Sequence, residues 1–122
     1  MNLKLVFRIF MVVQFINAIG AIFLTKAWVE AAGFTATDDL ITLGQAMGTA
    51  LLGYGFLALR MPAIAGDKLP AIGQAFAVVN GFFVLLIGFH ILNGQASGPT
   101  ATGNVIATAV LAVLFFLQSR KS

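Results

Sequence analysis

Four apolar segments, at about residues 4–24, 40–60, 70–92 and 102–118, occupy most of this 122-residue chain. Each is about 17–23 residues long, close to the ~20 residues that cross ~30 Å of hydrocarbon as a helix. The chain is 60% hydrophobic and only 9% charged, whereas a soluble domain carries about 25% charged residues. The sequence therefore predicts an all-α polytopic membrane protein, a single four-helix transmembrane bundle with no soluble domain.

The basic residues are distributed unequally between the two sides of these segments. Six of the seven lie at the N-terminus, in the second connection or at the C-terminus: Lys4, Arg8, Arg60, Lys68, Arg120 and Lys121. Only Lys26 lies on the other side. Because cytoplasmic loops retain Lys and Arg, we expect both termini to be cytoplasmic and the protein to be multi-pass in the cell inner membrane. At helix ends these charges meet anionic lipid headgroups, so we expect lipid partners and no nucleic-acid binding.

The composition excludes several kinds of chemistry. The chain has no cysteine, which removes disulfides, thiolate catalysis, iron–sulfur clusters and Cys-based zinc sites. No Asp or Glu lies deep in an apolar segment, so the intramembrane carboxylate of a proton-coupled carrier is missing. The sequence also lacks a nucleophile–His–acid set, a zinc-binding helix and a phosphate-binding loop. We therefore expect no catalytic residue, no metal site and no enzyme activity.

The connections carry recognisable start and stop signals. A short surface helix is expected over residues 27–32, ending at Gly33, which favours a left-handed C-cap. Thr37 then predicts the N-cap of the second long helix. We expect this helix to end at residues 60–62, which contain a proline, and residues 93–102 to form an uncharged loop.

Small residues at spacings of four mark two of the segments. Gly44 and Gly48 form a GxxxG pair, and Gly73, Ala77 and Gly81 repeat the spacing in the third segment. Helices in lipid associate by close backbone approach, which small residues permit. We expect these five positions to be helix-packing sites, either within the bundle, in self-association or against another integral membrane subunit.

Among the polar side chains within the apolar segments, four are candidates for one site: Gln14, Asn17, Tyr54 and Asn80. Gln45 and Gln74 could join them or face neighbouring proteins. Gln14 lies about 15 Å into the first segment at 1.5 Å per residue, and Asn80 is at about the same depth in the third. If these segments adjoin, the amides can hydrogen-bond across the interface and hold the helices together. Alternatively they form a ligand-binding patch near the midplane for the polar head of a lipid, a quinone or another small molecule.

His90 is the only histidine. It is a candidate axial ligand for a haem or chlorophyll, or a proton relay. The alternative is a polar residue near the interface, hydrogen-bonded to a neighbouring helix or to water. No second histidine or cysteine is present to complete a bis-ligated haem within the chain.

A weak internal repeat relates the two halves of the chain. Residues 49–56 share a pattern with 108–115, and residues 10–14 share one with 76–80. Duplication would give two helical hairpins related by an axis along the membrane normal. Chance similarity between apolar helices is the alternative.

The second segment has a recognisable pattern. Asp38-Asp39-Leu40, Gly44-Gln45-Ala46-Met47-Gly48 and Leu51-Leu52-Gly53-Tyr54-Gly55 follow one another here. This run resembles small bacterial four-helix membrane proteins of the DoxX-like kind, whose second helix opens after an acidic turn and carries a glycine stripe. The resemblance implies a four-helix bundle in the cytoplasmic membrane and assigns no catalytic residue.

Two functions are compatible with these patterns. The first is a non-enzymatic accessory subunit that assembles with or stabilises a larger membrane complex, as small size and small-residue stripes suggest. The second is a binding or transport module for a hydrophobic ligand such as a quinone, carotenoid, pigment or lipid, with the midplane amides at its polar end. The sequence predicts no intrinsic cofactor.

Overall fold

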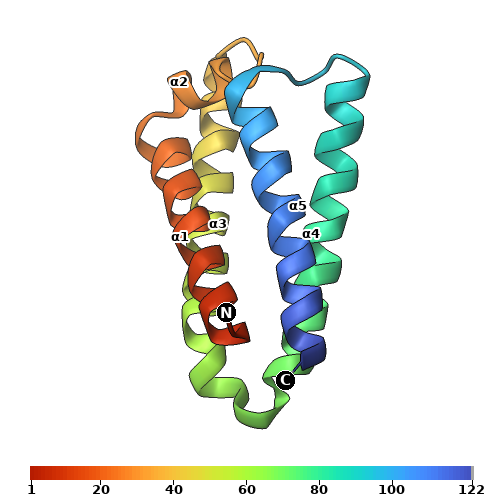
Figure 1. The fold of residues 1–122 in the computed structure, drawn as a ribbon. Helices are drawn as coiled ribbons and strands as arrows, with labels where there is room; N and C mark the ends of the chain where they lie inside the picture. The colour runs from red at the N-terminus through yellow and green to blue at the C-terminus, as the bar shows by residue number, and fades with distance from the viewer. Residues whose placement is uncertain (122) are drawn as a thin grey trace.

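The computed structural model describes residues 1–121, which are helical apart from short connections and include no strand. The elements are α1 (Leu3–Phe23), α2 (Thr25–Glu30), α3 (Asp38–Ala65), the 3-10 turn η1 (Gly66–Lys68), α4 (Leu69–Leu92) and α5 (Gly98–Lys121). The four long helices run side by side, with both termini at one end of the bundle and α2 at the other (Figure 1). We call these the termini end and the α2 end.

The bundle consists of two hairpins. Helix α1 packs along α3 and helix α4 packs along α5, whereas the contacts between these two pairs are far fewer. The first hairpin therefore contains α1, α2 and α3, the second contains α4 and α5, and η1 connects them at the termini end (Figure 1).

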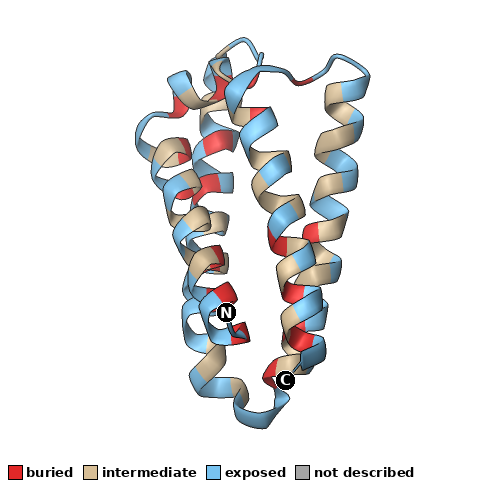
Figure 2. Ribbon diagram, in the orientation of Figure 1, coloured by how far each residue is buried: buried red, intermediate tan, exposed pale blue. Residues whose placement is uncertain are grey.

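The long helices are compatible with a membrane. Three helical stretches, Leu3–Phe23, Asp38–Leu92 and Gly98–Lys121, are long and apolar enough to cross one. The middle stretch contains both α3 and α4 and folds back on itself at η1 (Figure 1). Burial is confined to the helix sides that face one another (Figure 2). Large apolar side chains such as Leu92 and Phe23 are exposed, by 90% and 76%. An all-α protein with membrane-compatible helices is thus confirmed.

The predicted signals around α2 are present. The Thr37 hydroxyl accepts a hydrogen bond from the Leu40 N–H at 3.2 Å, which confirms this N-cap. Gly33 has a φ of 87°, the left-handed conformation predicted for it. The short helix itself begins at Thr25 and ends at Glu30, slightly earlier than expected.

Two predicted boundaries are wrong. Helix α3 continues through Pro62 to Ala65; the proline lacks the N–H that would bond to the carbonyl of residue 58, but it does not end the helix. Helix α5 begins at Gly98, so the connection that was expected to reach residue 102 is shorter. Pro99 follows the first residue of α5, and its fixed φ suits the first turn of a helix.

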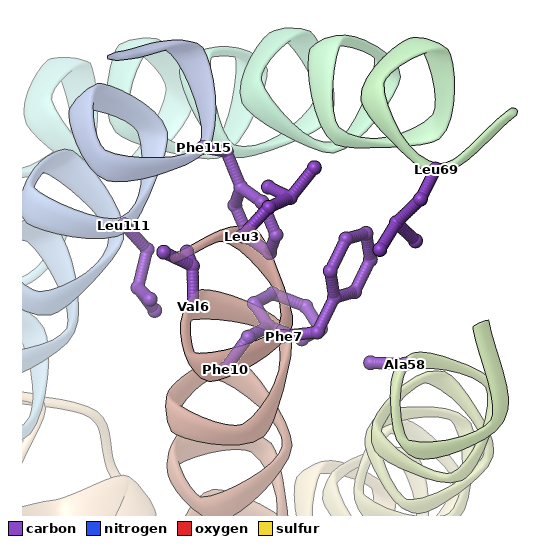
Figure 3. Packing of buried hydrophobic residues seen from close by; sticks show 8 residues of the cluster. All are labelled: Leu3, Val6, Phe7, Phe10, Ala58, Leu69, Leu111 and Phe115. Atoms are coloured by element: carbon purple, nitrogen blue, oxygen red, sulfur yellow. The ribbon is translucent and has the colours of Figure 1, made fainter. Parts of the chain in front are cut away.

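An aromatic core joins the two hairpins in the half nearer the termini. It contains Phe7 and Phe10 of α1, Tyr54 of α3, Phe76 of α4 and Phe115 of α5. The Phe7 ring meets the Phe76 ring edge-on at 5.0 Å and the Phe115 ring at 4.9 Å, between centroids. Figure 3 shows Phe7, Phe10 and Phe115 converging between the helices. Edge-to-face rings gain about 0.5–1.5 kcal/mol beyond simple burial.

Glycines permit the close approach of α1 and α3. A methyl group at Gly48 would lie 2.7 Å from Ile22 Cγ1 and 2.9 Å from Ala21 Cβ. At Gly44 it would lie 2.8 Å from Thr25 Cγ2. Both members of the GxxxG pair therefore face the first hairpin's own interface.

The predicted stripe on α4 is divided. Gly73 is buried, and a methyl group there would lie 3.0 Å from Leu3 Cδ1 and 3.2 Å from Ser119 Cβ. Ala77 packs against the buried cluster. Around Gly81, in contrast, a methyl group would meet no described atom within 4 Å.

We predict opposite effects for two Gly→Ala substitutions in α3. Gly48→Ala should lower the free energy of unfolding by about 1–3 kcal/mol, because the added methyl overpacks the α1–α3 interface. Gly53→Ala should be neutral or stabilising, because no described atom lies within 4 Å of the new methyl and alanine favours helix. Denaturant unfolding in detergent, followed by circular dichroism, measures both. Equal stability of the two variants would contradict this packing.

Candidate functional site

A cavity lies between the two hairpins, on the side of the aromatic core that faces the α2 end. Its deeper part, here called the polar compartment, has a volume of about 110 Å³. The residues that line it come from all four long helices and α2: Gln14, Asn17, Trp28, Met47, Leu51, Tyr54, Asn80, Phe83, Ile87, Asn104 and Thr108. The cavity therefore brings together all four residues that the sequence predicted for ligand binding.

Three of these polar residues lie at one level of the bundle. Gln14, Tyr54 and Asn80 are each eleven residues from the termini end of their helices, about 16 Å at 1.5 Å per residue. Three separate helices thus contribute a hydrogen-bonding side chain at the same depth, and α5 adds Thr108 from the fourth side. The result is a polar floor in an otherwise apolar bundle.

The asparagine amides bond to their own helices. Asn80 is only 2% exposed, and its Nδ2 donates to the Phe76 carbonyl oxygen at 2.8 Å. Asn17 Nδ2 donates to the Val13 carbonyl oxygen at 3.1 Å. Each asparagine thereby uses a donor within its helix, and its side-chain carbonyl oxygen remains an acceptor for another partner.

The predicted hydrogen bond across an α1–α4 interface is not formed. Helices α1 and α4 make few contacts, because α3 and α5 are the principal neighbours of α1. Gln14 and Asn80 line the same cavity, yet no hydrogen bond joins them in the described part of the chain. The interhelical bond was expected only if the first and third segments adjoined, and helices α1 and α4 make few contacts.

Tyr54 links the aromatic core to the cavity. Its ring lies 4.7 Å from the Phe10 ring and 5.4 Å from the Phe76 ring, between centroids. Its hydroxyl is buried and has no hydrogen-bond partner within residues 1–121. An unsatisfied buried donor in a native structure requires an explanation.

The cavity widens toward the α2 end into an apolar compartment of about 340 Å³. Its walls are mostly aliphatic and aromatic side chains from α2, α3, α4 and α5, among them Val29, Leu43, Leu86 and Ala101. The two compartments share five lining residues, which makes them adjoining parts of one space: Trp28, Met47, Phe83, Ile87 and Asn104.

Trp28 stands at the junction between the compartments. Its side chain packs on Gly20, where a methyl group would lie 2.9 Å from Trp28 Cδ1. The glycine thus leaves room for the indole beside α1. Trp28 is thus a wall of both compartments.

His90 lines the apolar compartment and not the polar one. It lies near the α2 end of α4, its backbone oxygen accepts a hydrogen bond from Ala96 N–H at 3.1 Å, and its ring is 6.1 Å from that of Phe89. No other titratable side chain of the described residues lines this compartment. Its role as an axial ligand stays a prediction.

Two polar wall residues were missed by sequence reasoning. Asn104 and Thr108 both come from α5, and Thr100 lines the apolar compartment four residues before Asn104. A polar stripe at positions 100, 104 and 108 marks one face of a helix. This spacing was available in the sequence, but the expected helix began at residue 102 and cut the stripe.

Comparison of the chain with protein-family models, curated proteins and solved structures finds no match in any of the three. The resemblance to DoxX-like proteins therefore stays a prediction.

We predict that Tyr54→Phe stabilises the protein when lipid and other bound molecules have been removed. The change deletes a buried hydroxyl without a partner and keeps the ring contacts, so the free energy of unfolding should rise by about 1 kcal/mol. Thr25→Val is the matched control, because the Thr25 hydroxyl donates to the Ala21 carbonyl oxygen at 2.5 Å and its loss should destabilise. Chemical unfolding in detergent measures the stability of both variants. Destabilisation by Tyr54→Phe would contradict the finding that the Tyr54 hydroxyl has no hydrogen-bond partner within residues 1–121.

Proposed function

We propose that this protein is a non-enzymatic membrane module that binds a small amphipathic molecule between its two helical hairpins. The observation that carries the proposal is the cavity, with uncharged hydrogen-bonding groups on its floor and apolar walls above them. Ligand sites are commonly concave and apolar, with a few polar groups that fix orientation. The polar compartment suits a head of a few heavy atoms, and the larger apolar compartment suits a hydrocarbon or ring system.

The membrane topology belongs to the same proposal. The four long helices would each cross the bilayer, in a multi-pass arrangement with both termini on the cytoplasmic side of the inner membrane. Support comes from the position of both termini at one end of the bundle (Figure 1). Six of the seven basic residues lie near the termini or the connection at that same end. The polar floor, at about 16 Å from that end, would lie near the middle of a ~30 Å hydrocarbon layer.

Such a ligand would come from the membrane itself. Quinones, carotenoids, other pigments and lipids are the candidate classes, and the members that suit the cavity combine an apolar body with a few polar atoms. Gln14, Asn17, Tyr54 and Asn80 would bind the polar end, together with Asn104 and Thr108. A polar floor in hydrocarbon is expensive unless it has partners, so a resident ligand would also stabilise the separated hairpins.

The accessory-subunit role is the weaker candidate. The small-residue stripes were one of its supports, and Gly44, Gly48 and Gly73 of these stripes all pack within the chain. What remains is a shallow groove on the outer face of α4 and α5, lined by Gly81, Ala109 and Ala112 among others. Assembly with a larger complex stays a prediction.

We predict that Asn80→Leu releases the ligand. Protein purified from membranes in mild detergent, extracted with organic solvent and analysed by mass spectrometry should carry one enriched compound per chain. Loss of one hydrogen-bonding group of the floor should reduce its retention about tenfold. Gln45→Leu is the matched control, because Gln45 is exposed on α3 and does not line the cavity.

Equal retention in the wild type, Asn80→Leu and Gln45→Leu would refute cavity binding. A wild-type protein that carries no such compound, and instead co-purifies with other polypeptides in fixed ratio, would establish the accessory role. Circular dichroism of each variant checks that it is folded.

A further inference from the structure

We infer that the occupant of the cavity is an uncharged molecule of the bilayer that enters sideways between α3 and α4. This inference rests on the proposed function and adds two properties to it, the charge of the ligand and its route. The two properties depend on different observations and are tested separately.

The charge follows from the composition of the walls. Neither compartment is lined by a Lys, Arg, Asp or Glu of the described residues, and His90 lines only the apolar one. An ionised head on this floor would lose its hydration without gaining a counter-ion, which is costly in a low-dielectric site. The floor offers instead a hydroxyl donor at Tyr54 and amide oxygen acceptors at Asn17 and Asn80. These groups match a hydroxyl or carbonyl head.

The α2 end of the cavity is closed by the two outer connections. Ser97 N–H donates to the Ala32 carbonyl oxygen at 2.8 Å, and Thr100 N–H donates to the Ala31 carbonyl oxygen at 3.3 Å. These bonds join the first hairpin to the second. Gly98, at a φ of 84°, lies directly against the Ala31 carbonyl, a position that excludes a larger residue. The cavity is therefore covered on the side that faces water.

The termini end is closed as well, because the aromatic core fills the space between the hairpins there (Figure 3). Tyr54 packs against the other rings of this core and also lines the polar compartment of the cavity. A route from the second aqueous side would have to displace these interlocked rings.

The α3–α4 flank is the open side. Four of the wall residues from these helices are exposed: Leu43 by 66%, Met47 by 43%, Phe83 by 43% and Leu86 by 51%. The wall residues from α1, α2 and α5 are buried or half-buried. Helices α3 and α4 make few contacts with each other, and they lie on opposite sides of the view toward the α2 end (Figure 1). The mouth is apolar, so it suits a ligand that arrives through hydrocarbon.

Trp28 provides a built-in reporter, since it is the only tryptophan and lines both compartments. Protein in phosphatidylcholine nanodiscs is titrated with dibromostearyl alcohol or with dibromostearate, the latter kept ionised by an alkaline buffer. The bromines quench indole fluorescence at short range. The alcohol should give a saturable component at about tenfold lower mole fraction than the carboxylate, and Asn80→Leu should remove that component.

The outcomes separate the inference from the proposed function. Saturable, Asn80-dependent quenching by both probes at the same mole fraction would refute the uncharged ligand while leaving cavity binding intact. Quenching that is unsaturable for both probes and unchanged by Asn80→Leu would refute cavity binding, and the inference would fall with it.

The route is tested by blocking the mouth. The chain has no cysteine, so Met47→Cys places a single thiol at the mouth and Leu57→Cys places one on the same helix. Both native side chains are exposed, and Leu57 does not line the cavity. After reaction with N-cyclohexylmaleimide and reconstitution, stopped-flow quenching by dibromostearyl alcohol should slow several-fold at position 47 only. An equal rate for both modified variants would overturn entry between α3 and α4.

Discussion

Close approach of helices in an apolar environment is the constraint on which this structure depends. Hydrocarbon surface gains little by leaving lipid, so helices stay together where backbones approach closely or side chains interlock. Gly44 and Gly48 provide the first kind of contact between α1 and α3. The aromatic core around Phe7 provides the second kind between the hairpins, in one half of the bundle only. The hairpins therefore separate beyond the core, and the cavity is the space between them.

The separation of the hairpins determines which hydrogen bonds the polar residues of the cavity can form. Had α1 and α4 been close neighbours, Gln14 and Asn80 could have satisfied each other. In the observed arrangement Asn80 bonds to its own helix and the buried Tyr54 hydroxyl has no partner within residues 1–121. Buried polar groups in native proteins are paired with protein, water or ligand. An uncharged membrane molecule would complete these hydrogen bonds without introducing a charge into hydrocarbon.

The sequence predicted the positions of the helices much better than it predicted which helices pack against each other. Hydropathy located the four long helices, and the Thr37 cap was correct because capping depends on local chemistry. Which helices pair depends on contacts between distant residues, so the separation of Gln14 from Asn80 could not be foreseen. The internal repeat also could not predict which residues pack together. Phe10 and its counterpart Phe76 both join the aromatic core, whereas Phe115 is buried and its counterpart Phe56 is exposed.

The most direct test of the account is a nuclear Overhauser measurement on the Asn80 side-chain amide. The protein would be deuterated except at exchangeable sites and embedded in protonated lipid, so that methylene protons come only from non-protein molecules. The account predicts cross-peaks from the Asn80 amide protons to such methylene protons, because an occupied cavity lies beside them. Cross-peaks to the Gln14 amide without any methylene contact would show a closed interface between the hairpins and would contradict the account.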